Sequence, residues 1–306
     1  MSLALAIDLG GTKVEAALVD EEGRILAGTR TREATGAAAA SDRSVLERAL
    51  SAVIARCRAL PEWSQVTAAG IGSAGPIDIG AGTIAPINLP AAHGMPIVAF
   101  VAEQSGLENV ALRLDGTCIA LAELWLGAAH GTSDAIVFVV STGVGGGIVS
   151  GGRLVAGASG NAGHIGQVVV SEIVDGDAAA STVEQLASGP HIVAWARAQG
   201  WAGSTGEELA DAYRRGDELA RAAVARSARA IGVGLAGAAT LLDLELAVVG
   251  GGFSFVADDF TEQIEASVRA AAVNAYAANL RVVRAGLGGD APLIGAAALV
   301  HRSDLL

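Results

Sequence analysis

Cysteine is scarce in this chain of 306 residues, which has only Cys57 and Cys118. These two residues form no metal-ligand cluster, and nothing around them suggests the disulfide framework of an extracellular protein. Aromatic residues are also few, at 4%, although hydrophobic residues make up 52% of the chain. The apolar content, much of it alanine, is ample for the core of one large domain or two ordinary ones.

Positive charge is in short supply as well. The chain has 20 Lys and Arg against 32 Asp and Glu, which gives a formal net charge of -12. An acidic surface repels the phosphates of nucleic acids and the headgroups of anionic membranes, so we expect neither as a partner. The charge does not exclude a nucleotide ligand, because local backbone N–H groups and a metal ion decide nucleotide binding.

The sequence lacks a long hydrophobic run. The longest uncharged stretch covers about residues 135–152, and its second half is too rich in glycine for a membrane helix. The first residues show no basic segment of the kind that opens a signal peptide. These two absences predict a cytoplasmic protein.

Glycine, in contrast, is abundant, with 41 residues. Near the start of the chain the apolar run Leu3–Ile7 ends in Asp8, a glycine-rich loop follows, and Val14–Val19 is again strand-like. A tight turn should then lead into a third strand at Arg24–Ala27. The pattern predicts a strand, a glycine loop and two further strands.

The loop after Asp8 has residue types that bind phosphate. Glycines let backbone N–H groups converge on phosphate oxygens because no Cβ blocks the approach. A carboxylate at the strand end can hold the Mg²⁺ of a nucleotide through water. The spacing is not that of a Walker A loop. An ordinary hairpin that contains glycine would explain the pattern equally well. The candidate residues for phosphate and Mg²⁺ are Asp8, Gly10, Gly11, Thr12 and Lys13.

The same plan returns later in the chain. Ile136–Val140 is strand-like, a glycine-rich loop follows at residues 142–147, and the strand pattern resumes at Ile148. Two matched loops support phosphate binding much better than one, and their separation indicates two related domains rather than a short-period repeat. This loop adds three candidate nucleotide-binding residues: Thr142, Gly143 and Gly145.

Two further features are ambiguous by themselves. The cluster Gly250, Gly251 and Gly252 follows a buried strand and would permit close approach of adenine and ribose, but taken alone it favours a plain strand-to-helix turn. Asp115 ends a strand-like stretch and begins a helix, where its carboxylate could accept the proton of an attacking hydroxyl. Spacing alone favours a simple helix N-cap at Asp115. Alternating strands and helices throughout predict an α/β architecture.

Three segments, Ile7–Lys13, Ser141–Gly152 and Val248–Gly252, together resemble the ROK (repressor, open reading frame, kinase) family of sugar kinases and sugar-responsive regulators. The resemblance covers nearly the whole chain. It implies an α/β fold of two actin/hexokinase-like (ribonuclease H-like) domains around an interdomain cleft, which close on a sugar and ATP. The first domain would comprise residues 1–112 and 291–306, and the second residues 113–290.

The resemblance also implies roles for single residues. Asp115 falls at the position of the catalytic base, which would deprotonate a sugar hydroxyl for in-line attack on the γ-phosphate of ATP, with Mg²⁺ as the metal. Gly75 and Asn88 fall at sugar-binding positions, and Glu184 matches a glutamate that contacts sugar hydroxyls. The implied partner is a small sugar. Members of this family are often dimers. The oligomeric state of this chain is left open, with a homodimer as one alternative.

Two departures from the family pattern concern residues that would contact the sugar. Leu114 stands where an asparagine usually precedes the catalytic aspartate, and it cannot form a hydrogen bond with the sugar. His164 stands at a sugar-contact position where many members have glutamate, and we expect it to contact the ligand. The segments Ser141–Arg153 and 162–166 are similar to bacterial N-acetylmannosamine kinases. The 6-hydroxyl of N-acetylmannosamine is therefore the first choice of acceptor, and glucose is the second.

A third departure concerns zinc. The family usually has a histidine after a Gly-Glu-Ile-Gly-type segment, followed by three cysteines. This chain has Gln167 at the histidine position and no cysteine near residues 175–182. Because a zinc site needs His, Cys or carboxylate ligands at set spacing, we predict no structural zinc.

Three alternatives to an ATP-dependent sugar kinase stay open to different degrees. A sugar-sensing repressor is poorly supported, because only seven residues precede Asp8 and no basic helix is present. A sugar-binding sensor without catalysis is supported by Leu114 and the missing zinc motif, but opposed by Asp115 and both phosphate loops. A kinase that uses polyphosphate is not excluded, although the Gly250–Gly252 cluster favours a donor with adenosine.

Overall fold

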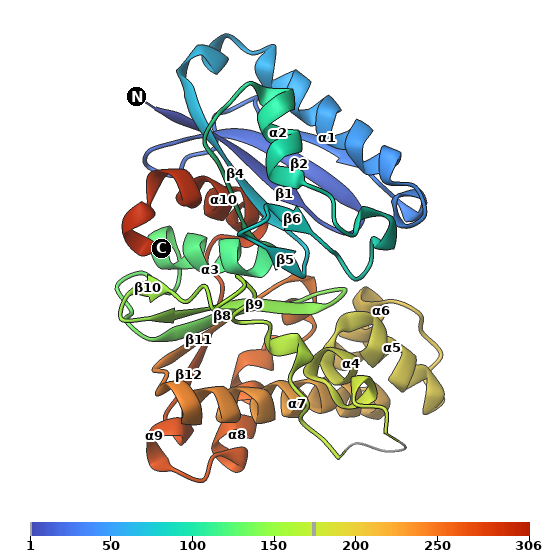
Figure 1. Ribbon diagram of the computed structural model, residues 1–306. Coiled ribbons are helices and arrows are strands. Elements are labelled where there is room, and N and C mark those ends of the chain that lie inside the picture. Colours follow the sequence, from blue (N-terminus) through green and yellow to red (C-terminus); the bar gives the residue numbers. More distant parts are fainter. Residues whose placement is uncertain (1, 173–175) are drawn as a thin grey trace. The chain divides into compact units, whose positions relative to one another are not determined.

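Strands and helices alternate along the chain, as predicted, and they form two units that each contain a β-sheet (Figure 1). The computed structural model describes residues 2–172 and 176–306. Unit 1 comprises the chain up to Gly127 together with Arg153–Ala162 and Gly289–Leu306. Unit 2 comprises Ala128–Gly152 and Gly163–Gly288.

The sheet of unit 1 has the strand order β3–β2–β1–β4–β7. Its strands are β1 (Leu3–Leu9), β2 (Lys13–Asp20), β3 (Thr31–Ala34), β4 (Val66–Ser73) and β7 (Val110–Leu114). β2 runs antiparallel to β1 and β3, whereas β4 runs parallel to β1 and β7. Three short strands complete the unit: β5 (Ile77–Asp78), β6 (Thr83–Ile84) and β10 (Arg153–Leu154). The parallel strands β1, β4 and β7 end at the same edge of the sheet.

Helices cover both faces of this sheet, which is why every residue of β1 is buried. The helices of unit 1 are α1 (Arg43–Arg58), α2 (Ile97–Ser105), α3 (Asp115–Leu126) and α10 (Ala291–His301). Leu5 and Ile7 of β1 share a hydrophobic cluster with α1 and α2. Ala4 and Ala6, which point to the other face, share a cluster with α10.

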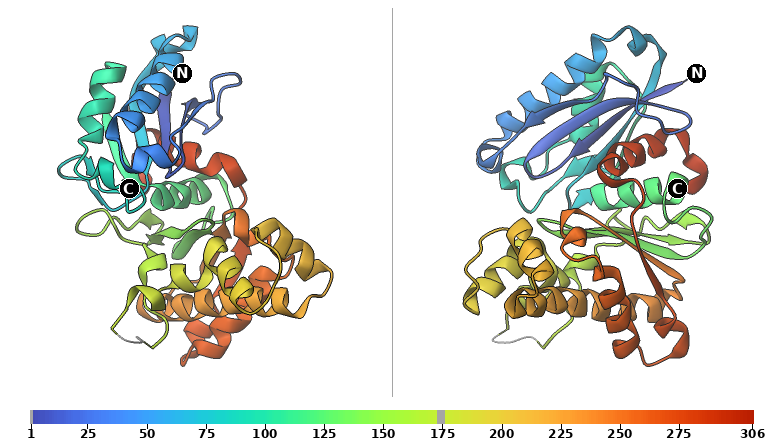
Figure 2. Two further views of the ribbon diagram at one scale, coloured as in Figure 1. Left: turned by 90° about the vertical axis from the view of Figure 1, so that its right-hand side faces the viewer. Right: turned by 180° about the vertical axis from the view of Figure 1, so that it is seen from behind.

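Small residues bring α10 close to its neighbours. A Cβ at Gly70 of β4 would lie 1.8 Å from the carbonyl oxygen of Ala296, and one at Gly295 would lie 1.7 Å from that of Cys118 in α3. The red helix α10 and the green helix α3 accordingly lie side by side in Figure 1 and in both views of Figure 2. Gly70 and Gly295 therefore serve the close packing of α10 against β4 and α3.

Unit 2 contains β9 (Val144–Ser150), β8 (Ala135–Val140), β11 (Leu246–Gly250) and β12 (Arg281–Arg284), which are neighbours in this order. β8 and β9 are antiparallel, and β11 is parallel to both β8 and β12. The helices are α4 (Val183–Ala187), α5 (Gly189–Ala198), α6 (Gly206–Arg214), α7 (Glu218–Leu242), α8 (Phe260–Ala271) and α9 (Ala275–Ala278). Phe138 and Phe260 are the largest side chains that are fully buried in its core.

One predicted strand is wrong. Arg24–Ala27 forms no strand, and only Ile25 makes an isolated bridge, to Val19. The carboxylate of Asp20 accepts hydrogen bonds from the backbone N–H groups of Glu22 and Arg24, at 3.0 and 2.9 Å. These bonds hold the backbone in a turn, so the third strand of the sheet starts only at Thr31.

The described helices also bear on the membrane question. Within residues 2–172 and 176–306, no helix combines the length and the apolar character that a membrane span requires.

Candidate active site

The sheet of unit 1 places two predicted site residues at one edge. Asp8 of β1 is in register with Gly72 of β4, Ser73 is in register with Leu114 of β7, and Asp115 follows directly. The carboxyl ends of parallel strands are a common location for ligand sites in open α/β sheets. Asp8 and Asp115, although far apart in sequence, therefore lie near each other.

Both carboxyl groups have raised pKa values. Burial raises the pKa of Asp115 to about 6, against the lowering effect of the Gly116 N–H, which donates to Oδ1 at 2.7 Å. Burial also raises the pKa of Asp8 to about 7, and the nearby charge of Asp115 adds to this, while Lys13 and Arg30 oppose it. A carboxylate with a pKa in this range is suited to proton transfer near neutral pH.

The Cys118 thiol lies close to these carboxyl groups. Burial raises its pKa well above the usual value, and the charges of Asp115 and Asp8 raise it further. The thiol is therefore protonated at neutral pH.

The first glycine loop is a tight turn whose lysine is engaged in an ion pair. The Gly10 N–H donates to the Lys13 carbonyl at 3.0 Å. The Lys13 ammonium lies 2.5 Å from the carboxylate of Glu15, which also accepts from Arg30 and Arg32, each at 2.9 Å. This network was not predicted from the sequence, because Glu15 is a single polar residue within an otherwise apolar strand pattern.

We predict that Glu15 stabilises unit 1 through this network. Burial acts to raise the pKa of Glu15, but hydrogen bonds from Lys13, Arg32 and Arg30 lower it to about 2. Since the folded pKa lies below the unfolded value, this stability is complete above about pH 4.5 and is lost as the pH falls towards 2. Glu15→Gln should lower the free energy of unfolding by about 1–2 kcal/mol at pH 7 and by less at pH 4.

Urea unfolding at both pH values measures this difference. Glu22→Gln, which alters an exposed carboxylate paired with Arg24, is the matched control and should change stability by less than about 0.5 kcal/mol. An equal effect of Glu15→Gln at pH 7 and pH 4 would contradict the electrostatic explanation.

Unit 1 also contains two of the predicted sugar-binding positions, Gly75 and Asn88. A Cβ at Gly11 would lie 1.8 Å from Nδ2 of Asn88, so the Asn88 amide lies directly against the first glycine loop. The Ile87 N–H donates to the Gly75 carbonyl at 3.1 Å, which holds the two sugar-binding positions together. Leu114 is buried and covers Gly75, where a Cβ would lie 2.2 Å from Cδ2 of Leu114.

In unit 2, the second glycine loop joins β8 to β9. The Ser141 N–H donates to the Gly143 carbonyl at 2.9 Å, which closes the turn around the exposed Thr142. The Gly189 N–H donates to the Ser141 carbonyl at 2.9 Å, so α5 begins against the loop. At Gly145 an added Cβ would meet no atom within 4 Å, so the backbone of this residue is accessible.

The third glycine cluster lies next to this loop. Gly251 has φ of 86°, and a Cβ there would lie 2.4 Å from the Val140 carbonyl oxygen, at the end of β8. Both the backbone conformation and the contact therefore require glycine. Gly250 ends β11, and Gly252 starts a short 3₁₀ helix that runs to Phe255. The cluster is thus a turn from strand to 3₁₀ helix that packs against the strand end before the second loop.

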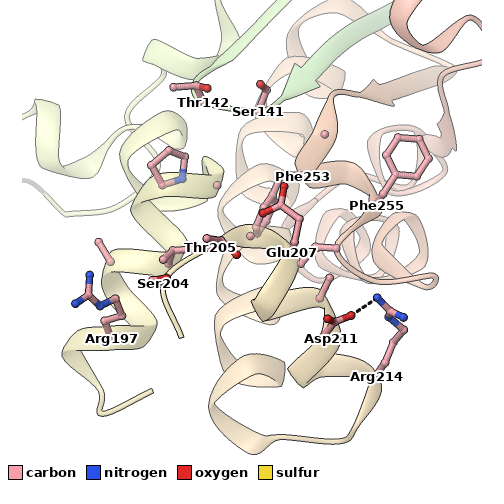
Figure 3. Close-up of a pocket in the computed structure, with 18 residues that line it drawn as sticks. Ser141, Thr142, Arg197, Ser204, Thr205, Glu207, Asp211, Arg214, Phe253 and Phe255 are labelled. Atoms are coloured by element: carbon pink, nitrogen blue, oxygen red, sulfur yellow. Dashed lines mark hydrogen bonds and ion pairs between the residues drawn. The ribbon is translucent and has the colours of Figure 1, made fainter. Parts of the chain in front are cut away.

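A pocket of about 740 Å³ opens beside these two glycine segments (Figure 3). Ser141 and Thr142 lie at one end of it, and the ion pair of Asp211 with Arg214 lies at the other. The walls come from α5, α6 and the 3₁₀ helix after β11, with Gly189, Pro190, Val193, Ala194, Arg197, Ser204, Thr205, Gly206, Glu207, Ala210, Gly252, Phe253, Phe255 and Val256 as further lining residues. Sequence reasoning missed the walls on α5 and α6.

Unit 2 also brings His164 and Glu184 together. The Val144 N–H donates to Oε2 of Glu184 at 2.8 Å. Burial lowers the pKa of His164, while the nearby Glu184 raises it, with a net lowering from the usual value. The imidazole is therefore mainly neutral at neutral pH and can both donate and accept a hydrogen bond.

Comparison with known proteins identifies the family. Residues 4–303 match the ROK family. The chain belongs to the ROK family.

Three relatives span almost the whole chain. N-acetylmannosamine kinase from Escherichia fergusonii is 32% identical, over 98% of this chain and 99% of its own. The structure of a ROK family glucokinase from Streptomyces griseus, in complex with glucose and AMPPNP, is 31% identical with a TM-score of 0.81, over 97% of this chain and 99% of its own. A ROK hexokinase from Thermus thermophilus is 30% identical with a TM-score of 0.81, over 99% of both chains.

These relatives confirm three predictions: the family, the fold class of two actin/hexokinase-like domains, and the enzyme class, a sugar kinase. The roles of single residues stay predictions. Within residues 2–172 and 176–306, no three His, Cys, Asp or Glu side chains are arranged to hold a metal ion. The absence of structural zinc stays a prediction as well, since Asp175 of the segment in question lies outside the described residues.

Proposed function

We propose that this ROK family member transfers the γ-phosphoryl group of ATP to a hydroxyl of a hexose or N-acylhexosamine. The 6-hydroxyl of N-acetylmannosamine is the first choice of acceptor, and glucose is the alternative. The observation that carries the proposal is the unit 2 pocket, which has the Thr142 loop at one end and Gly252, the last residue of the third glycine cluster, in its wall.

The pocket is suited to the nucleoside part of the donor. Its volume of about 740 Å³ lies within the usual range for small-molecule sites, roughly 300–1,000 Å³. Pro190, Val193 and Ala210 offer an apolar surface to a base, and the hydroxyls of Ser141 and Thr142 can donate to phosphate oxygens at the other end. AMPPNP in the Streptomyces griseus glucokinase supports an adenine nucleotide as the donor.

The buried carboxylate of Asp115 would act as the general base. Its Oδ1 accepts the Gly116 N–H, so Oδ2 would take the proton of the sugar hydroxyl. The hydroxyl oxygen forms a bond to the γ-phosphorus, the bond from the γ-phosphorus to its bridging oxygen breaks, and ADP leaves. Oxygen donors are what Mg²⁺ prefers, so the Asp8 carboxylate at the strand end fits a magnesium ion held through water. That ion would neutralise charge on the phosphate oxygens.

The sugar would be recognised by Gly75, Asn88, His164 and Glu184. Asn88 offers an amide, Glu184 an acceptor, and the neutral His164 both a donor and an acceptor. Leu114 is buried against Gly75 and offers no hydrogen bond, so this chain would hold the sugar with fewer polar contacts than relatives that have asparagine there. His164 and the N-acetylmannosamine kinase from Escherichia fergusonii support the first-choice substrate.

The proposal includes a cytoplasmic enzyme whose partner is a small sugar, without nucleic acid or membrane. The net charge of -12 supports both exclusions. The proposal leaves the oligomeric state open, with a homodimer as one alternative.

An ADP-release assay with Mg-ATP tests the proposal. The acceptor panel contains N-acetylmannosamine, glucose, mannose, N-acetylglucosamine and allose, and inorganic polyphosphate replaces ATP in a parallel series. We expect turnover with ATP and the highest kcat/KM on N-acetylmannosamine. Turnover with glucose alone would favour the glucokinase alternative. Turnover with polyphosphate alone would show that polyphosphate, and not ATP, is the phosphoryl donor. Sugar binding without turnover would favour a non-catalytic sensor.

The pocket assignment gives a separate prediction. Ala210 of α6 lines the pocket and is partly exposed, so Ala210→Trp would fill space needed by the nucleoside. We expect the KM for ATP to rise by at least about tenfold, with the KM for the sugar changed by less than about twofold. Steady-state kinetics with each substrate varied in turn measures both constants. An unchanged KM for ATP in the folded variant would show that the nucleoside does not bind in this pocket.

A further inference from the structure

The carboxylate of Glu184 is held from two sides within unit 2. Oε2 accepts the Val144 N–H at 2.8 Å, and Oε1 accepts from Nε2 of Gln167 at 3.3 Å. The backbone of Gly143 closes a third side, because a Cβ there would lie 2.5 Å from Oε2. The carboxylate therefore has little freedom to rotate, and the orientation of its free lone pairs is fixed.

The backbone around Gln167 is itself well defined. Gln167 ends the 3₁₀ helix Ile165–Gln167, and the next residues run beside the start of α4. The Val183 N–H donates to the Val168 carbonyl and the Val170 N–H donates to the Ser181 carbonyl, both at 2.9 Å. This pairing, with the bridge of Val169 to Thr182, sets Gln167 beside Glu184.

The two hydrogen bonds on Glu184 connect to different parts of the proposed site. Val144 lies within the second glycine-rich segment, residues 142–147, which would bind phosphate, whereas Gln167 follows the His164 segment that would bind sugar. A carboxylate accepts about four hydrogen bonds, so both bonds leave lone pairs free for sugar hydroxyls. Loss of the Gln167 amide would leave the Val144 bond in place and would free Oε1 to turn away from the sugar.

We propose that Gln167 is a positioning residue that orients Glu184 towards the sugar, a role that rests on the proposed function of Glu184 as a sugar contact. Gln167 does not touch the reacting atoms. It supplies a neutral amide donor at a position where the family usually has a histidine.

Two variants of Gln167 test this role in the sugar kinase assay. Gln167→Met keeps the length of the side chain and removes the donor, so the KM for N-acetylmannosamine should rise by about tenfold. The KM for ATP should change by less than about twofold, because the Val144 bond is retained. Gln167→His restores an N–H donor and should bring the KM for the sugar back to within about threefold of the unaltered protein.

A double-mutant cycle separates positioning from a general structural role. Glu184→Ala removes the group on which Gln167 acts, so Gln167→Met should have less than about a twofold effect on kcat/KM for the sugar in that background. A full tenfold effect in the Glu184→Ala background would overturn the proposal, as would an unchanged KM for the sugar in Gln167→Met itself. If the unaltered protein phosphorylates none of the panel sugars, the proposed function fails, and this role fails with it.

Discussion

Asp115→Asn should lower kcat by about a thousandfold, with the KM values for sugar and ATP changed by less than about threefold. Asparagine has nearly the same shape and can still accept the Gly116 N–H that Oδ1 accepts at 2.7 Å. It cannot take a proton from the sugar hydroxyl, and removal of a general base typically costs between a hundredfold and ten-thousandfold, roughly, in rate. Steady-state kinetics at saturating sugar and ATP measures the loss.

The matched control for this substitution is Asp42→Asn. Asp42 is also an aspartate at the start of a helix, where it accepts the Ser44 N–H at 2.9 Å, but it is exposed and caps α1. Asparagine is an equally good N-cap, so kcat and stability should both stay at the level of the unaltered protein. Substantial turnover by Asp115→Asn would show that another group removes the proton.

Gly11→Ala should raise the KM for the sugar by about thirtyfold while the protein stays folded. The new methyl carbon would lie 1.8 Å from Nδ2 of Asn88, so the exposed Asn88 side chain must move away. Since that atom is the end of a flexible side chain, the strain is relieved by a change in its position rather than by unfolding. The affinity for the sugar then falls, because the sugar loses the Asn88 amide as a hydrogen-bond partner.

Kinetics and urea unfolding together check this prediction. Gly237→Ala is the control, because an added Cβ at Gly237 of α7 meets no atom within 4 Å and alanine favours the helix. If Gly11→Ala raises the KM for the sugar by displacing Asn88, it should have little further effect on that KM in an Asn88→Ala background, whatever it does to the KM for ATP through the phosphate loop. A thirtyfold effect in both backgrounds would contradict the displacement of Asn88 as the cause.

Local sequence patterns predicted the elements of the fold well. The strands expected at Leu3–Ile7 and Val14–Val19 are β1, Leu3–Leu9, and β2, Lys13–Asp20, because both runs are predominantly apolar. The strand expected at Arg24–Ala27 is absent because side-chain hydrogen bonds from Asp20 hold that backbone in a turn, and apolar spacing does not report such bonds. The domain limits, residues 1–112 with 291–306 and 113–290, stay a prediction.

The candidate site was less predictable from the sequence than the fold. Glycine patterns indicated the two segments that line the pocket at Ser141 and Gly252, because the requirement for close backbone approach is visible in the residue type. The pocket walls on α5 and α6 gave no such signal, since a cavity depends on how helices pack. The ion pairs of Glu15 were missed for a similar reason: Arg30 and Arg32 reach it from a different part of the chain.

The central claim is that this ROK family member moves a phosphoryl group from ATP to a sugar hydroxyl, and product analysis tests it most directly. The protein is incubated with Mg-ATP and N-acetylmannosamine, and then with Mg-ATP and glucose, and the products are identified by ³¹P and ¹³C NMR. We predict ADP together with a phosphate monoester on the 6-hydroxyl of the sugar, formed in equal amounts. ADP that appears with free inorganic phosphate and unmodified sugar, or ATP that stays intact with both sugars, would contradict the claim.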